Sequence, residues 1–190
     1  MRALVIISSL AVAAFALPAQ AQWYVGAGVG QSAFKDELSC QGTGGGGVSC
    51  DDKDNALKLF GGYQINPNFA AELTYQDFGN ASASGGGFNA QIKSNAFDVS
   101  ALGMLPFGGQ FAGYGRLGLF YAKSEGTSNI PGIANVSETN TGLTYGLGLQ
   151  WSPMPNLGVR AEYQVYHDVG GGDLGKGDID VLGVSALYRF

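Results

Sequence analysis

His167 and Asp168 are adjacent side chains that could carry out acid–base chemistry, and His167 is the only histidine among the 190 residues. An imidazole beside a carboxylate can act as a general base, but hydrolysis or acyl transfer at such a base also needs a serine beside the ring. The sequence contains no His-x-Ser pattern. We therefore expect His167 to be an amphipathic ring at the end of a strand.

Cys40 and Cys50 are the only cysteines, and the glycines of 44–47 lie between them. An even number of cysteines in an exported chain predicts a disulfide. Closing a loop of about ten residues removes roughly 2.5–3 kcal/mol of unfolded-chain entropy. A metal site would need further ligands, which a sequence with one histidine does not supply nearby.

Two stretches of the sequence contain several carboxylates. They are residues 51–54, and residues 170–180 with Asp173 and Asp178. Their oxygens could bind Ca²⁺ or Mg²⁺, but neither stretch has the spacing of a dedicated site, so we expect solvated loop charge. The glycines at 26, 28 and 30 resemble a phosphate loop only superficially, because no helix follows them. We predict no catalytic, metal or cofactor site.

The N-terminus is typical of a secretory signal peptide. Arg2 precedes the apolar run 3–17, and Ala19-Gln20-Ala21 is an A-x-A cleavage site. Cleavage after Ala21 leaves one domain, residues 22–190. The formal net charge of −5 disfavours nucleic acid as a partner.

Beyond the predicted signal peptide, eight segments alternate between apolar and small or polar residues. They cover 22–31, 55–65, 69–78, 92–105, 110–123, 140–151, 157–167 and 179–190. Period-two alternation indicates β-strands, and each segment is near the ~9–11 residues that a tilted strand needs to cross a bilayer.

The connections between these segments alternate in length. Tight turns are expected at 66–68, 106–109 and 152–156, whereas longer connections are expected near 32–54, 79–91, 124–139 and 168–178. Short turns at one end and long loops at the other are typical of an outer-membrane barrel. We therefore predict an all-β, eight-stranded antiparallel up-and-down transmembrane barrel with short periplasmic turns and long extracellular loops; the alternative is a secreted β-sandwich.

The side chains fit this topology. Aromatic residues of the apolar face gather at the short-turn ends and predict one girdle: Trp23, Tyr63, Phe69, Phe111, Trp151 and Phe190. A second girdle is expected near Tyr75, Phe97, Tyr121 and Tyr145. The charged residues of the opposite face predict a lumenal network: Lys58, Glu72, Asp98, Arg116, Arg160, Glu162 and Arg189.

The mature sequence resembles the membrane domain of OmpA-type outer-membrane proteins. The resemblance is carried by WYVGAGVG at 23–30, FGGYQINPNFAAELTYQDFG at 60–79, YGRLGLFYA at 114–122 and VRAEYQVY at 159–166. It implies a monomeric barrel among outer-membrane lipids and lipopolysaccharide. It also implies that Tyr188 and the terminal Phe190 form the signal read by the outer-membrane assembly machinery, although Ser185 replaces the family's usual glycine.

Two departures from the family concern function. Full-length members continue into a peptidoglycan-binding domain, whereas this sequence stops at Phe190, so we expect no cell-wall anchoring. Glu72 and Arg160 match the family's lumenal charge positions, but Leu102 and Gln150 replace a Lys and a Glu. We therefore expect an incomplete network and no salt-bridge gate.

An eight-stranded barrel is just wide enough for its own side chains, which disfavours a large pore. The sequence predicts a non-enzymatic surface, structural or adhesion-type protein that meets a host or surface ligand through its loops. One alternative is a small ion or solute channel. The other is a lipid A-modifying barrel enzyme, which would need His167.

Overall fold

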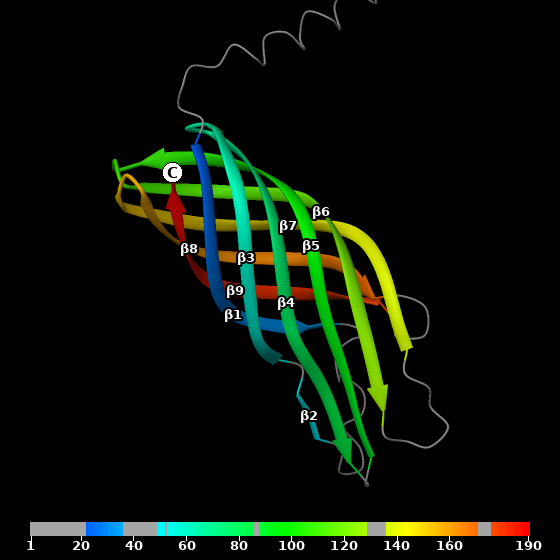
Figure 1. Ribbon diagram of the computed structural model, residues 1–190. Coiled ribbons are helices and arrows are strands. Elements are labelled where there is room, and N and C mark those ends of the chain that lie inside the picture. Colours follow the sequence, from blue (N-terminus) through cyan, green and yellow to red (C-terminus); the bar gives the residue numbers. More distant parts are fainter. Residues whose placement is uncertain (1–21, 36–48, 52, 86–87, 129–135, 171–175) are drawn as a thin grey trace, which may run out of the picture.

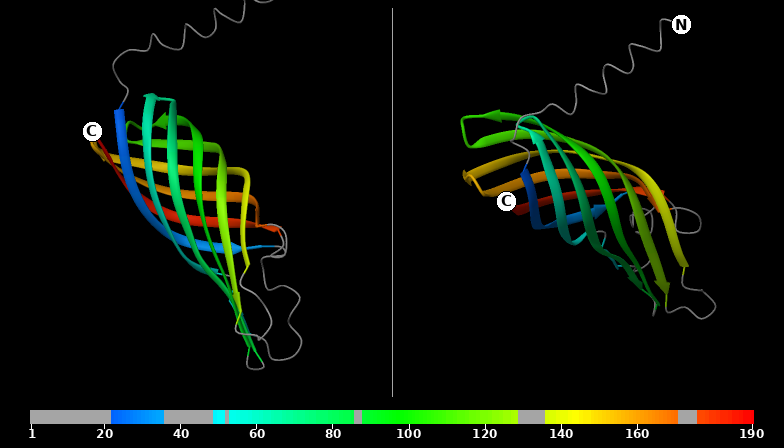
Figure 2. Two further views of the ribbon diagram at one scale, coloured as in Figure 1. Left: turned by 45° about the vertical axis from the view of Figure 1, so that its right-hand side comes forward. Right: turned by 45° about the horizontal axis from the view of Figure 1, so that its top comes forward.

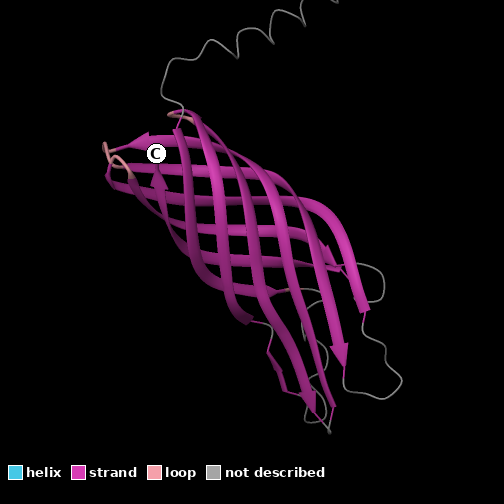
Figure 3. Cartoon of the chain, viewed as in Figure 1, coloured by secondary structure: helices cyan, strands magenta, loops and turns pink. Residues whose placement is uncertain are grey.

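The computed structural model describes residues 22–35, 49–51, 53–85, 88–128, 136–170 and 176–190. Within these ranges, every element is a strand (Figure 3). The strands are β1 (Gln22–Phe34), β2 (Ser49–Asp51), β3 (Lys53–Asn66), β4 (Phe69–Gly85), β5 (Phe88–Phe107), β6 (Phe111–Ser128), β7 (Val136–Met154), β8 (Leu157–Gly170) and β9 (Lys176–Arg189). No helix of the described residues is long and apolar enough to cross a membrane.

Eight long strands form a closed antiparallel barrel (Figure 1). Sequence neighbours pair with one another, and β1 pairs with both β3 and β9, which closes the sheet. The short β2 pairs with the outer end of β4 and is not one of the eight strands that form the barrel. The predicted fold class is confirmed.

Alternation along each strand separates a lumenal face from a lipid face. Leu147 is 72% exposed and Val99 63% exposed, whereas the inward-facing Glu72 and Leu102 are almost completely buried. An exposed face of Leu, Val and aromatic side chains would be unfavourable in water over so large an area, but hydrocarbon solvates it. The outer surface of the strands is therefore the surface that meets lipid.

The three tight turns lie at the same end of the barrel as the C-terminus (Figure 1). At the first turn, the Asn66 side-chain oxygen accepts hydrogen bonds from the backbone N–H groups of Asn68 and Phe69. At the second, Gly108 and Gly109 take positive φ angles of 58° and 77°, which favour glycine. These turns identify the periplasmic end.

At the opposite end, β4, β5, β6 and β7 extend well beyond the other strands and form a one-sided wall (Figure 2). The prediction of long loops at 79–91 and 124–139 is therefore wrong for most of both ranges, because strand pairing continues through them. These stretches are rich in Gly, Ser and Asn. Above the membrane no lipid imposes an apolar face, so the alternation that reveals a strand is lost while the backbone ladder persists.

Glycines on the lumenal face make room for large aromatic rings. A Cβ atom on Gly62 would lie 2.2 Å from the Tyr24 ring, and one on Gly148 would lie 2.4 Å from the Tyr114 ring. Neither distance is tolerable, so each tyrosine depends on a glycine of a neighbouring strand. The inward-facing glycines thus allow the lumen to be filled.

Candidate functional site: the lumen and the outer rim

Six charged side chains gather in the middle of the lumen, three cationic and three anionic. They are Lys58, Glu72, Asp98, Arg116, Arg160 and Glu162. The seventh predicted member, Arg189, lies apart at the periplasmic mouth, where its guanidinium contacts Ser152 Oγ and the Pro155 carbonyl at 3.4 Å. The cluster carries no net formal charge, as a buried set of charges requires.

The first set of contacts in the cluster is centred on Glu72 of β4. Its carboxylate accepts hydrogen bonds from the guanidinium groups of Arg116 and Arg160, the latter at 2.6 Å. The Tyr24 hydroxyl donates a third at 2.9 Å. The side chains of Glu72 and Arg116 have no exposed surface, so their contacts are made without competing water.

Glu162 on β8 holds the second set of contacts. It pairs with the Lys58 ammonium, accepts a 2.5 Å hydrogen bond from the Tyr114 hydroxyl, and lies 3.6 Å from Arg116 Nη1. Arg116 thus lies between two glutamates that come from opposite sides of the barrel. One guanidinium joins β4 to β8 across the lumen.

Asp98 on β5 is held largely by neutral donors. It accepts hydrogen bonds from Tyr166 at 2.8 Å and from Ser100 at 2.6 Å, while Arg116 Nη1 lies 3.9 Å away. The Gln164 side-chain oxygen accepts from Arg116 at 2.8 Å, and its amide donates to Thr144 at 2.9 Å. The network therefore continues into uncharged side chains.

Leu102 and Gln150, the two departures noted in the sequence, do not leave the network open. Leu102 pairs directly with Arg116 across the β5–β6 ladder, so the neighbouring strand supplies a guanidinium at the same level. Gln150 accepts a 2.9 Å hydrogen bond from Arg160 Nε. The expectation of an incomplete network is therefore wrong. Matching positions along one strand cannot reveal that a charged group comes from the neighbouring strand instead.

Two clusters of buried, largely apolar side chains, named here the periplasmic layer and the outer layer, pack against the charged cluster, and the rings of Tyr24, Phe60 and Tyr114 lie 5.1–5.3 Å from the Arg160 guanidinium. The periplasmic layer comprises Tyr24, Phe60, Ala70, Leu102, Met104, Ala112, Tyr114 and Leu187. The outer layer comprises Phe34, Ala56, Phe78, Ala96, Phe120, Ala122, Tyr166, Val169, Ile179 and Val181. An ion crossing the lumen would have to pass both layers and break the ion pairs between them.

Two cavities adjoin the described side chains of the lumen. A pocket of about 20 Å³ beside Lys58, Glu162 and Gln164 has room for about one water molecule. A vestibule of about 220 Å³ opens at the periplasmic end, lined in part by Met104 and Arg189. The periplasmic apolar layer lies between the two.

The aromatic side chains predicted as a girdle face outward at the periplasmic end. The rings of Trp23 and Tyr63 are 4.9 Å apart, and those of Phe111 and Trp151 are 6.5 Å apart. Phe69 is 58% exposed beside the first tight turn. These rings lie where a bilayer's polar interface would meet the barrel.

The C-terminal residues predicted as the assembly signal lie at the same end. The rings of Tyr188 and Phe190 lie 5.4 Å apart on the outward face. The backbone N–H of Phe190 donates to the Trp23 carbonyl at 3.0 Å, which ties this end of the chain to β1. Both rings are exposed to lipid, where another protein could contact them during assembly.

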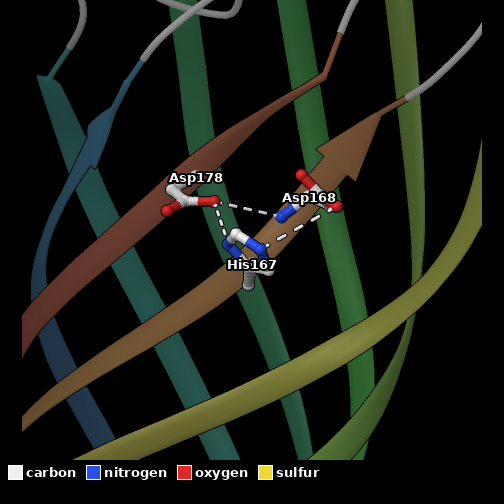
Figure 4. Close-up of side chains that lie close together, drawn as sticks. All are labelled: His167, Asp168 and Asp178. Atoms are coloured by element: carbon white, nitrogen blue, oxygen red, sulfur yellow. Dashed lines mark hydrogen bonds and ion pairs between the residues drawn. The ribbon is translucent and has the colours of Figure 1, made fainter.

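A second polar group lies outside the barrel, at the outer ends of β8 and β9 (Figure 4). His167 Nδ1 lies 2.7 Å from Asp178 Oδ1, and His167 Nε2 lies 3.9 Å from Asp168 Oδ2. Nearby, Asp180 pairs with Lys35 at 2.5 Å and accepts a hydrogen bond from the Tyr163 hydroxyl. The contact between His167 and Asp178 was not predicted from the sequence, because Asp178 was assigned to the loop 168–178.

The other predicted positions fall outside what the structure shows. Residues 1–21 and Cys40 lie outside the described residues, and the side chain of Cys50 is not described. The signal-peptide cleavage and the disulfide therefore remain predictions.

A family model described as "OmpA-like transmembrane domain" matches residues 18–190. The chain belongs to this family. It is 29% identical over 191 residues to outer membrane protein A of Salmonella typhi, covering 96% of this chain and 53% of that protein. Outer membrane protein A of Klebsiella pneumoniae is also 29% identical, over 184 residues. The chain spans about half the length of these curated relatives.

Solved structures of outer-membrane proteins share this fold. Ail of Yersinia pestis, crystallised with the heparin analogue sucrose octasulfate, matches 90% of this chain and 99% of its own, with a TM-score of 0.58 and 19% identity. Neisserial surface protein A matches 88% of this chain and 97% of its own, with a TM-score of 0.60 and 15% identity. Fold and family together place this OmpA-like barrel in the outer membrane, in contact with its lipids.

Proposed function

We propose that this OmpA-like barrel is a non-enzymatic adhesion-type surface protein: a lipid-embedded support with a closed lumen that presents its outer strands and loops to a ligand. The enclosed charge cluster carries the proposal. Because six mutually paired charges are packed against two clusters of buried, largely apolar side chains, the lumen serves as packed core, and the outer end is left as the surface for recognition.

The wall formed by β4–β7 supports this division of roles. Strand pairing between β6 and β7 continues out to Gly126 and Val136, well beyond the outer aromatic residue Tyr121. A paired wall holds the connections at its end on a rigid base, which lowers the entropy lost when they bind a partner. A protein that only has to span the membrane does not need strands that extend beyond it. A protein that presents a binding surface does benefit from them.

The partner we propose is a host-cell or other surface protein. Ail was solved with a sulfated polyanion, but two outer lysines of this chain already have carboxylate partners: Lys35 pairs with Asp180 and Lys123 pairs with Glu125. At these two positions a polyanion would meet cations that a carboxylate already balances. The Gly-, Ser- and Asn-rich connections suit adaptable hydrogen bonding to a protein surface.

Adhesion of a non-adherent Gram-negative host that displays the chain would test the proposal. We expect the displayed chain to increase attachment to epithelial cells. Replacing residues 126–138 with a tight turn should abolish the increase, whereas the lumenal Tyr166→Phe should retain it. Attachment no greater than with the empty vector, in cells whose outer membrane contains the heat-modifiable barrel, would contradict the proposal.

A small channel is the second candidate, and the vestibule at the periplasmic mouth of the lumen is the observation that favours it. Conduction would need the ion pairs to rearrange and both apolar layers to admit water. Discrete current steps in a planar bilayer would support it. We do not propose lipid A modification, because the hydrogen-bond partner of the His167 ring among the described residues is Asp178 and not a serine.

The remaining proposals concern export and assembly. We propose that the signal peptide is cleaved after Ala21, that Tyr188 and Phe190 are read by the assembly machinery, and that the barrel works as a monomer in contact with lipopolysaccharide. The exposed rings of Tyr188 and Phe190 support the second of these. Deleting Phe190 should lower the amount of folded barrel in the outer-membrane fraction without changing the amount of chain synthesised.

A further inference from the structure

The two nitrogens of the His167 ring have different surroundings. Nδ1 lies 2.7 Å from Asp178 Oδ1, a hydrogen-bond distance to an acceptor, so this nitrogen carries the proton when the ring is neutral. Nε2 then has a free lone pair, and it lies 3.9 Å from Asp168 Oδ2. This separation is too long for a hydrogen bond.

The same separation suits two ligands of one cation. Zinc binds imidazole nitrogen at about 2.0–2.1 Å and carboxylate oxygen at about 2.0–2.2 Å, so two ligands of a tetrahedral ion lie about 3.4 Å apart. His167 Nε2 and Asp168 Oδ2 would need to approach by about half an ångström. A carboxylate that holds the other nitrogen of the ring, as Asp178 does, is the usual support of a metal-binding histidine.

The position of the group allows an ion to enter from outside. His167 and Asp168 are about half exposed, and their ligand atoms and that of Asp178 all lie within 4.8 Å of one another. The neighbouring cation, Lys35, is already paired with Asp180, so the two carboxylates beside His167 exceed the charge of the ring even when it is protonated. A divalent cation would neutralise this excess.

We propose that His167 Nε2 and the Asp168 carboxylate bind a zinc-class divalent cation at the outer rim, with water at its remaining positions and Asp178 orienting the ring. An imidazole donor favours Zn²⁺, Ni²⁺ or Cu²⁺ over Ca²⁺ and Mg²⁺, which prefer oxygen ligands alone. The bound ion would join the end of β8 to β9 through the ring and Asp178. It would thereby fix the two strand ends on either side of the last extracellular connection.

Calorimetric titration of the folded full chain in detergent with zinc chloride tests the proposal. The chain should carry no polyhistidine tag, and a C40S/C50S background should show that thiols do not contribute. We expect one ion per chain, with affinity lowered at least about tenfold by His167→Ala and by Asp168→Asn. Asp178→Asn should weaken binding less than His167→Ala, and the matched control Glu125→Gln, an exposed carboxylate on β6, should leave it unchanged.

A spectroscopic measurement on the unmodified chain covers the case in which a variant fails to fold. With a single histidine, ¹⁵N NMR of the labelled ring should show zinc shifting Nε2 while Nδ1 stays protonated. The proposal is overturned by a lack of saturable binding up to about 1 mM zinc, by equal affinity in folded His167→Ala, by an unmoved Nε2 resonance, or by equal competition from Ca²⁺.

Discussion

The lumenal cluster and the group at the outer rim (His167, Asp168 and Asp178) both contain carboxylates, but they differ in how their charges are balanced. In the lumen, Glu72 accepts hydrogen bonds from two guanidinium groups and a tyrosine, and three anions balance three cations. At the rim, one imidazole lies between two carboxylates that have room for another partner. The lumenal side chains are buried, whereas His167 and Asp168 are about half exposed.

This difference shows what burial imposes. A buried charge without a partner costs several kilocalories, so the lumen must satisfy its charges within the protein. At the rim, water solvates the unbalanced carboxylates at little cost, and the same groups remain available to an external ligand. The closed site therefore serves stability, and the open one can serve binding.

Glu72→Gln should produce the largest effect. It removes the anion between Arg116 and Arg160 and leaves two guanidinium groups buried with excess positive charge. We expect a loss of about 3–5 kcal/mol in the free energy of unfolding, measured by urea titration in lipid vesicles. A loss as small as that of Asp178→Asn, whose side chain is only partly buried, would mean that burial does not distinguish the two sites.

The substitution Leu147→Arg tests the cost of an unpaired charge on the lipid-facing surface of the barrel. Leu147 is 72% exposed at mid-strand, where an arginine would have neither water nor a counter-ion. The free energy of unfolding should fall by about 2–4 kcal/mol, and the yield of heat-modifiable barrel should fall with it. An unchanged yield would contradict the assignment of faces.

Tyr166→Phe tests a neutral member of the network. The Tyr166 hydroxyl donates to Asp98 at 2.8 Å, but Ser100 also donates to this carboxylate. Because the donors Ser100 and Gln164 remain, we expect a loss of about 1 kcal/mol in the same urea titration. A loss as large as that of Glu72→Gln would show that the hydroxyl is as important as the charge.

Lys35→Ala should have the smallest effect. Lys35 pairs with Asp180 at 2.5 Å, but its side chain is 54% exposed, and the Tyr163 hydroxyl also donates to Asp180. Loss of the pair should cost at most about 1 kcal/mol, and less in high salt. A salt-independent loss above that value would mean that the rim is more desolvated than its exposure indicates.

Much of the fold could be predicted because lipid and lumen impose opposite requirements on alternate residues. Leu147, Glu72 and Trp23 were assigned to the correct face by parity alone. The outer halves of β4–β7 could not be recognised, because their sequences are rich in Gly, Ser and Asn and only backbone pairing identifies the strand. Strand extent depends there on partners that one segment does not reveal.

The candidate sites divide in the same way. The lumenal charges could be predicted because they share one parity, but their individual contacts could not. Arg116 reaches both Glu72 and Glu162, and this depends on the registers of the four strand pairs from β4 to β8. The contact between His167 and Asp178 depends likewise on the register between β8 and β9. This register cannot be predicted from the sequence of either strand alone.

Planar-bilayer recording of the refolded chain tests the central claim, a lumen sealed by two apolar layers, most directly. We expect no discrete current steps from the unmodified chain. Thinning both layers at once, with Leu102→Ala, Met104→Ala, Phe78→Ala and Phe120→Ala, should admit water and make steps appear, provided that the variant still shows a heat-modifiable band. Reproducible steps from the unmodified chain would contradict the closed lumen and favour the channel.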